Sequence, residues 1–154
     1  MTKDEWVEVC GAVLEAEGID QFHPLELADV GRKAPNITPY DTHHLVAPPL
    51  DLIPNAIKLC HVLCDLRAAV RPAPVLVSSW YRDVIYNHCV GGVVRSMHLT
   101  GGAADVTKVG FTPAEVAEIL DRHPKSDQFG LGRYRTFTHI DIRGMINRSS
   151  PARW

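Results

Sequence analysis

The sequence lacks any long hydrophobic run, and no stretch approaches the roughly 20 consecutive apolar residues that a membrane-spanning helix needs. The first residues, MTKDEW, also lack the basic and then apolar layout of a secretory signal. These two absences predict a protein without a signal peptide or membrane span, synthesised in the cytoplasm. Any action outside the membrane would then require release by another factor.

An excess of charge of either sign is also lacking, because 16 basic and 18 acidic side chains leave a formal net charge of −2. This near balance excludes electrostatic attraction to nucleic acid or to an anionic membrane as the main basis of binding. The length of 154 residues, with 45% hydrophobic residues, is typical of a globular domain. We therefore expect a single domain over residues 1–154 that acts as a monomer.

The four cysteines lack the spacing of a zinc finger. Cys60 and Cys64 lie one helical turn apart in a segment with the pattern of a buried helix. We therefore expect reduced core thiols in preference to a disulfide or a cysteine metal site.

Capping signals and hydrophobic spacing predict a mixture of helices and short strands. Helices are expected over residues 2–18, 24–30, 54–70 and 112–123. Strands are expected over residues 74–79, 102–107 and 137–143, the first of them buried. Residues 33–49 have four prolines and no periodicity, which predicts an irregular loop. This mixed order favours an α+β fold with a small, largely antiparallel central sheet.

The strongest functional signal is the segment SMHLTGGAAD, which spans residues 96–105. His98 and Asp105 are separated by the pair Gly101-Gly102, which makes a continuous helix unfavourable. A glycine turn would instead let the chain fold back, so that Asp105 on a strand meets His98 on a loop. In the last strand His139 and alternate polar side chains face away from an apolar row, so His139 could join them.

Two imidazoles and one carboxylate suit a zinc ion, and three protein ligands leave a fourth position for water. That open position is typical of catalytic zinc sites. The alternative is structural: Asp105 would cap a turn, His98 would be a solvated loop residue, and His139 would be an ordinary strand histidine. Spacing alone leaves both interpretations open.

The pattern S-x-H-x-x-G-x-A-x-D at residues 96–105, followed by a strand that carries His139, resembles the M15 family of zinc D-Ala-D-Ala peptidases. Within that family it is most similar to the small cell-wall endopeptidases of bacteria and phages. Other similar segments are SWYR at 79–82, YN at 86–87, VGG at 90–92 and GLGRY at 130–134. The resemblance implies a central antiparallel sheet flanked by helices, as in the hedgehog signalling domain.

The resemblance also implies an activity, the hydrolysis of peptide bonds in peptidoglycan stems or cross-links. Zinc would be held by His98, Asp105 and His139. Arg82 matches an arginine that contacts the substrate carbonyl in the family, while Ser96 and Tyr81 are expected at the substrate. Alternatively, Arg82 forms a salt bridge at the strand end and Ser96 is a turn residue.

At the positions where the family has its general base, this sequence has other residue types. Relatives have a glutamate three residues before the last histidine ligand or a histidine two residues before it, and these positions are Thr136 and Phe137 here. Asp141 is our substitute, because it shares a strand face with His139. Alternatively, Asp141 orients His139 or pairs with Arg143, and the base is Asp127.

Three functions follow from the resemblance. The first is an endopeptidase resembling phage endolysins, which reaches the wall through phage-mediated release or as part of a virion. The second is a D-Ala-D-Ala carboxypeptidase. The third is an inactive module that keeps zinc for stability and binds the wall or a partner, which the missing glutamate favours.

Overall fold

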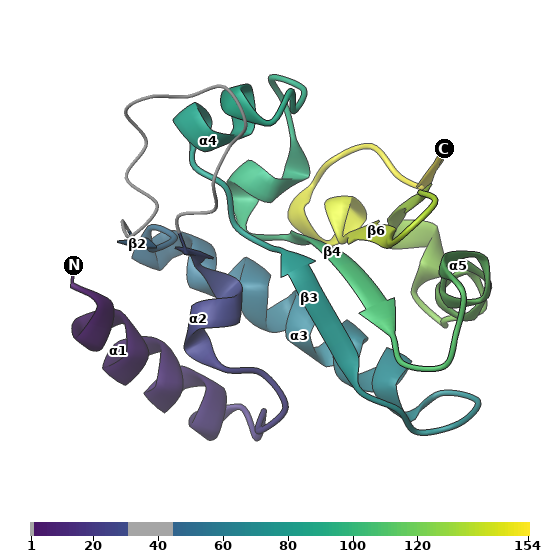
Figure 1. Ribbon diagram of the computed structural model, residues 1–154, viewed down its shortest axis with the longest axis horizontal. Helices are drawn as coiled ribbons and strands as arrows, with labels where there is room; N and C mark the ends of the chain where they lie inside the picture. The colour runs from purple at the N-terminus through teal and green to yellow at the C-terminus, as the bar shows by residue number, and fades with distance from the viewer. Residues whose placement is uncertain (1, 31–44) are drawn as a thin grey trace.

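A computed structural model describes residues 2–30 and 45–154 of the chain (Figure 1). Within this part of the chain, five strands form the main sheet in the order β3-β4-β6-β5-β7. Their bounds are β3 (Val75–Ser79), β4 (Ala103–Lys108), β5 (Gly130–Arg133), β6 (Thr138–Asp141) and β7 (Ala152–Arg153). Neighbouring strands are antiparallel except that β7 runs parallel to β5. The α+β prediction is confirmed, and the sheet departs from an antiparallel pattern at this edge.

Across the described residues, five α-helices accompany this sheet. Their bounds are α1 (Lys3–Ala16), α2 (Pro24–Leu27), α3 (Ile53–Ala68), α4 (Val84–Cys89) and α5 (Pro113–Asp121). Two of them, α3 and α5, pack directly against its strands. Apolar side chains of α3 and α5 join those of Ala104, Val106 and Ile140 in a buried core cluster. Since side chains alternate along a strand, Asp105 and His139 must lie on the opposite face.

Local sequence signals account for most of the helices. Thr2 and Thr112 both form capping boxes, with Glu5 and Glu115, at the starts of α1 and α5. Gly18, which has a φ of +68°, follows the end of α1. The predictions for these helices and for α3 are therefore confirmed to within about two residues, the usual uncertainty of helix ends.

The second predicted helix is too long. The helix α2 ends at Leu27, because Ala28 is extended and the backbone of residues 29–30 pairs with another strand. These strands, β1 (Asp29–Val30) and β2 (Leu45–Val46), form an antiparallel pair. The predicted loop at 33–49 is wrong at β2, and its residues 33–44 lie outside the described part of the chain.

The predicted buried strand at residues 74–79 is a half-exposed edge strand. In β3 the side chain of Val75 is buried and that of Leu76 is 54% exposed. Buried or partly buried side chains alternate with exposed ones along β3, so one face of this strand packs against the protein while the other faces solvent. The prediction of burial on both faces was wrong.

The cysteines are free thiols, as expected for all four positions. Cys10 and Cys60 are buried in the core, while Cys64 and Cys89 are partly exposed. Across residues 2–30 and 45–154, no helix has both the length and the apolar character to cross a membrane.

Candidate metal centre

The register between β4 and β6 sets Asp105 directly opposite His139. Directly opposed residues of antiparallel strands have their side chains on the same face and in contact. His98 comes from the short helix η2 (Met97–Thr100), which Ser96 caps. Gly101 ends η2 in the left-handed conformation, with a φ of +69°, and turns the chain into β4. This is the fold-back that the glycine pair predicted.

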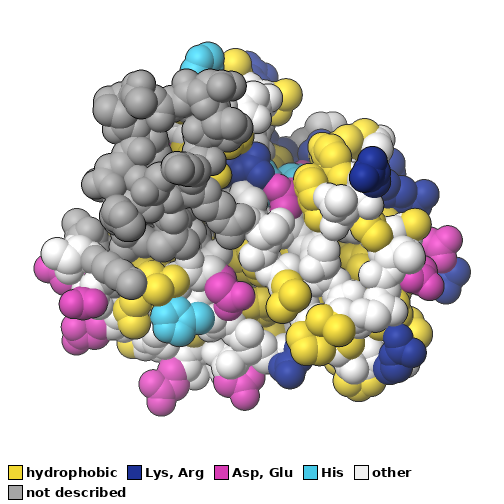
Figure 2. Space-filling model, in the orientation of Figure 1, with side chains coloured by type: hydrophobic (Ala, Val, Ile, Leu, Met, Phe, Trp, Pro, Cys, Tyr) yellow, Lys and Arg dark blue, Asp and Glu magenta, His cyan; other side chains and the backbone are white. Residues whose placement is uncertain are grey.

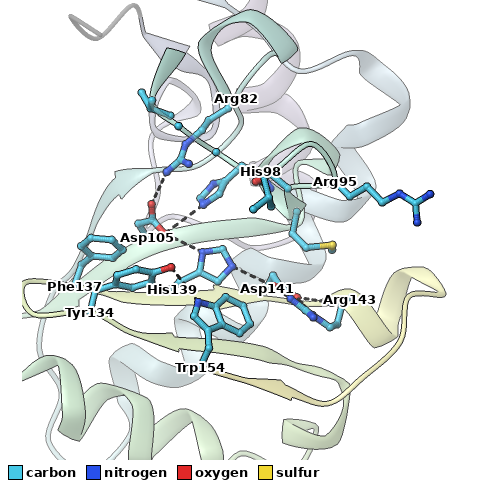
Figure 3. Close-up of a pocket in the computed structure, with 16 residues that line it drawn as sticks. Arg82, Arg95, His98, Asp105, Tyr134, Phe137, His139, Asp141, Arg143 and Trp154 are labelled. Carbon is cyan, nitrogen blue, oxygen red and sulfur yellow. Dashed lines mark hydrogen bonds and ion pairs between the residues drawn. The ribbon is translucent and has the colours of Figure 1, made fainter. Parts of the chain in front are cut away.

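The three predicted ligands converge at one point on this face (Figure 3). Asp105 Oδ1 lies 3.3 Å from His98 Nε2 and 3.0 Å from His139 Nδ1. One ligand atom from each residue lies within 4.8 Å of the other two. All three side chains are buried, with His98 only 2% exposed.

Hydrogen bonds to the other ring nitrogens select the atoms that face this point. His98 Nδ1 lies 2.6 Å from the carbonyl oxygen of Trp80. Since a carbonyl only accepts, Nδ1 carries the proton and Nε2 presents its lone pair toward Asp105. His139 Nε2 lies 3.1 Å from Asp141 Oδ2, which similarly leaves His139 Nδ1 for a metal.

Electrostatics keep two of the ligands, His98 and Asp105, in the protonation states that metal binding requires. Burial lowers the pKa of His98, so this imidazole is neutral. Burial alone would raise the pKa of Asp105, but the contacts of its carboxylate with His139 and His98 outweigh this effect and hold the pKa well below its usual range. Asp105 Oδ2 also accepts a hydrogen bond of 2.6 Å from Arg82 Nη2. Metal ligands must be deprotonated to bind, and these two groups are.

His139 lies between two carboxylates. Burial would lower its pKa, but hydrogen bonds to Asp105 and Asp141 outweigh that effect and raise the pKa above the usual value. The donor set of two imidazole nitrogens and one carboxylate oxygen could hold a metal and fits zinc.

The convergence point opens into a cavity of about 500 Å³. Arg82, Arg95 and Arg143 contribute positive charge to its lining, and Tyr134 and Trp154 contribute aromatic surface. In Figure 2, basic, acidic and histidine side chains appear together in a recess beside a group of hydrophobic side chains. Such a concave, partly apolar site with a few polar groups is typical of a ligand site.

The predicted substrate-contacting residues separate into two groups. Arg82 and Ser96 line the cavity, and Ser96 Oγ also accepts a hydrogen bond of 3.3 Å from the backbone N–H of His98. Arg82 donates from Nε to Ser79 Oγ over 2.8 Å. Tyr81 is buried next to Trp80 and is not among the residues that line the cavity.

Asp141 lines the cavity, but its carboxylate is fully buried and engaged on both oxygens. Arg143 Nε donates to Oδ1 over 2.9 Å and Arg143 Nη2 donates to Oδ2 over 2.8 Å. Burial would raise the pKa of Asp141, but Arg143 and His139 outweigh it and hold the pKa well below its usual range. Asp127, the other predicted base, is exposed on the short helix η3 (Ser126–Gln128) and does not line the cavity.

Strand β5, which pairs with the strand that carries His139, was not predicted to contribute to the site. A Cβ at Gly130 would overlap Asp141 Oδ2, and a Cβ at Gly132 would lie 2.6 Å from Trp154 Nε1. The two glycines therefore make room for side chains on the site face, while Leu131 between them is buried in the core. The alternation Gly-x-Gly in a strand was the signal that could have revealed this.

Comparison with known proteins places this geometry in a family. The family described as Peptidase M15 matches residues 39–141, which include His98, Asp105 and His139. No curated protein and no solved structure matches the chain. The match covers well over half of the chain, and together with the His-Asp-His cluster it indicates a zinc metallopeptidase. The chain belongs to the M15 peptidase family.

Proposed function

We propose that this protein is a zinc-dependent peptidase that hydrolyses peptide bonds in the stems or cross-links of bacterial peptidoglycan. The observation that carries the proposal is the convergence of His98 Nε2, Asp105 Oδ1 and His139 Nδ1 beside an open cavity in an M15 chain. The choice of peptidoglycan rests on the similarity of residues 96–105 to the motif of cell-wall endopeptidases. In this proposal the protein reaches the wall through phage-mediated release or as part of a virion.

Zinc held by these three residues would supply a Lewis acid for the scissile carbonyl and a water of pKa about 7. We assign to Arg82 the stabilisation of negative charge on the carbonyl oxygen. The bonds from Arg82 to Ser79 and Asp105 use two of the five N–H donors of its guanidinium. Among the residues that the structure describes, the remaining side-chain donors of Arg82 have no further hydrogen-bond partner, and they could serve a substrate in the cavity that Arg82 lines.

The contacts of Asp141 favour an orienting role over that of the base. A general base needs an accessible lone pair and a pKa near the working pH. Asp141 is fully buried, and both of its oxygens accept hydrogen bonds from Arg143. Its Oδ2 also faces His139 Nε2, the arrangement that fixes a histidine ligand in one tautomer.

A second function is favoured by the same contacts. Among the described residues, the carboxylates that line the cavity are Asp105 and Asp141, and both are engaged with histidine and arginine. A cavity of this kind suits a module that keeps zinc for stability and binds a wall peptide without cutting it. A D-Ala-D-Ala carboxypeptidase is the third candidate, and only its products distinguish it from an endopeptidase.

Digestion of purified peptidoglycan, with and without a chelator, tests these functions through the masses of the released fragments. The proposal expects soluble muropeptides whose masses correspond to a cut within a stem or cross-link, and no fragments once the chelator is present. Release of D-alanine alone would indicate the carboxypeptidase. Co-sedimentation with the wall without any fragments would indicate the binding module, and hydrolysis insensitive to the chelator would refute a metal mechanism.

The role of Asp141 can be measured separately with Asp141→Asn. If Asp141 orients His139, the substitution weakens zinc binding by roughly 10- to 100-fold, as changes to outer-shell partners do. A base would instead leave the zinc Kd unchanged while kcat falls. Asp127→Asn is the matched control, because Asp127 is exposed and outside the cavity.

A further inference from the structure

On the sides that do not face Asp105, His139 lies beside Asp141 at the end of β6 and Trp154 directly after β7. Asp141 lies at its Nε2 atom, and the ring of Trp154 lies 5.3 Å away, measured between ring centroids. The guanidinium of Arg143 lies 5.2 Å from the centroid of the Trp154 ring and also binds Asp141 through two nitrogens. Figure 3 shows these side chains in a continuous group next to His139.

This group depends on the parallel strand β7, which continues past Arg153 in its hydrogen bonding. The backbone N–H of Trp154 donates to Leu131 over 3.1 Å, and its carbonyl accepts from Arg133 over 2.8 Å. The indole Nε1 donates to the Tyr134 hydroxyl over 3.0 Å. These bonds fix the indole in the space that Gly132 leaves open.

We infer that Arg143 and Trp154 are positioning residues that hold the imidazole of His139 in its metal-binding orientation. Arg143 acts through Asp141, since it neutralises the buried carboxylate and fixes the direction of both oxygens. Trp154 supports the guanidinium from one side through a cation–π contact and limits rotation of His139 through its own ring. The inference rests on the proposed function, because it concerns the zinc ligand His139.

Without these positioning residues, part of the free energy of metal binding would be spent on ordering the imidazole of His139. A histidine that can rotate freely must be ordered when the ion binds, whereas one already held in place binds without that loss. Without Arg143, the buried charge of Asp141 would lack its bidentate partner, and Asp141 would no longer present Oδ2 to His139 in a fixed direction. Loss of an outer-shell partner of this kind costs roughly 10- to 100-fold in metal affinity.

Zinc affinity of the full chain, measured by competition with a chromophoric chelator, tests the inference. Arg143→Gln and Trp154→Ala are expected to raise the zinc Kd by roughly 10- to 100-fold. Both should also alter the visible spectrum of the cobalt(II)-loaded protein, because the ligand field follows the orientation of His139. Arg143→Lys should restore part of the affinity, and Trp154→Phe should restore more than Trp154→Ala.

Arg71→Gln is the matched control. Its guanidinium lies 5.0 Å from the centroid of the Phe111 ring, and no part of Arg71 lines the cavity. This substitution should leave the zinc Kd and the cobalt spectrum unchanged. If Trp154→Ala does not fold, Trp154→Phe and the Arg143 variants still decide the question.

An unchanged Kd and an unchanged cobalt spectrum in both Arg143→Gln and Trp154→Ala would overturn the inference. That result is distinguishable from failure of the proposed function, in which the wild-type chain would itself bind no zinc. Effects of the same size in Arg71→Gln would also overturn the inference, because they would show a general loss of stability.

Discussion

At the scale of single residues, Asp105 connects the two histidines of the site with Arg82. Its Oδ1 atom faces both histidines and its Oδ2 atom binds Arg82. One oxygen of the carboxylate is therefore available to a metal while the other links the centre to the arginine we assign to the substrate. A neutral side chain of the same shape would retain the packing and lose the charge.

Asp105→Asn should consequently weaken zinc binding by more than the roughly 10- to 100-fold that outer-shell substitutions cost, because it changes a ligand itself. Isothermal titration with zinc measures the effect, and Asp127→Asn, on the exposed η3 helix, is the control. Equal affinity in Asp105→Asn and the wild type would remove Asp105 from the ligand set.

At the scale of elements, a buried lysine from β4 donates hydrogen bonds to backbone carbonyls at the C-terminal end of α3. Lys108 is 1% exposed, and its Nζ donates to the carbonyl oxygens of Leu66 over 2.7 Å and Ala69 over 2.6 Å. Its ammonium group also lies 4.5 Å from the centroid of the Phe111 ring. The lysine therefore serves the Leu66 carbonyl at the helix end and shares the Ala69 carbonyl with the backbone N–H of Arg71, which donates over 2.7 Å.

Lys108→Met keeps the aliphatic bulk but removes the donor to the Leu66 carbonyl and one of the two donors to the Ala69 carbonyl. It should therefore lower the free energy of unfolding by about 1–3 kcal/mol. Urea unfolding followed by circular dichroism measures this, with Lys125→Met at an exposed position as the control. The zinc affinity of the folded variant should not change, because Lys108 lies outside the cavity. A variant as stable as the wild type would show that water reaches these carbonyls.

The two glycines of β5, Gly130 and Gly132, lack the Cβ atoms that would clash with neighbouring side chains of the site. Gly132→Ala should lower the free energy of unfolding by about 1–3 kcal/mol, because the added methyl group overpacks against the indole of Trp154. Gly11→Ala in α1 is the matched control. A Cβ at Gly11 would meet only Pro24 Cγ at 3.8 Å, an ordinary contact, so this helix should become slightly more stable.

Thermal unfolding of both variants compares the two sites directly. Stability equal to the wild type in Gly132→Ala would mean that Trp154 can move away at no cost. That result would also weaken the positioning role inferred for Trp154.

At the scale of the whole molecule, stability should depend on pH through the buried carboxylates. Asp105 and Asp141 have pKa values below the usual value of about 3.9 in an unfolded chain. Between the folded and unfolded pKa values the unfolded state binds more protons, so stability falls as pH falls. The stabilisation is therefore complete above about pH 4 and is lost progressively at lower pH.

Denaturant unfolding of the metal-free protein between pH 2 and pH 6, values chosen to bracket the usual carboxylate pKa, measures this dependence. Asp141→Asn should show a shallower loss of stability below about pH 4, because one of the two responsible groups is absent. An identical slope in the wild type and the variant would contradict the assignment.

The sequence by itself determined the features whose signals are local. Capping boxes at Thr2 and Thr112 and the helical spacing of α3 depend on residues a few positions apart, so they could be predicted without a structure. The same holds for His98 and Asp105, which one glycine turn brings together. His139 was identifiable from its resemblance to a family motif.

Only the tertiary structure decided the features that depend on neighbours distant in the chain. The exposure of one side of β3 depends on which of its faces the rest of the fold covers, and the glycine-rich β5 has no hydrophobic pattern that marks a strand. The environment of Asp141 is equally non-local. Its position two residues after His139 allowed a base or an orienting partner, and burial beneath Arg143 and Trp154 favours the second. Packing and electrostatics act through space, so residues adjacent only in the folded chain control these outcomes.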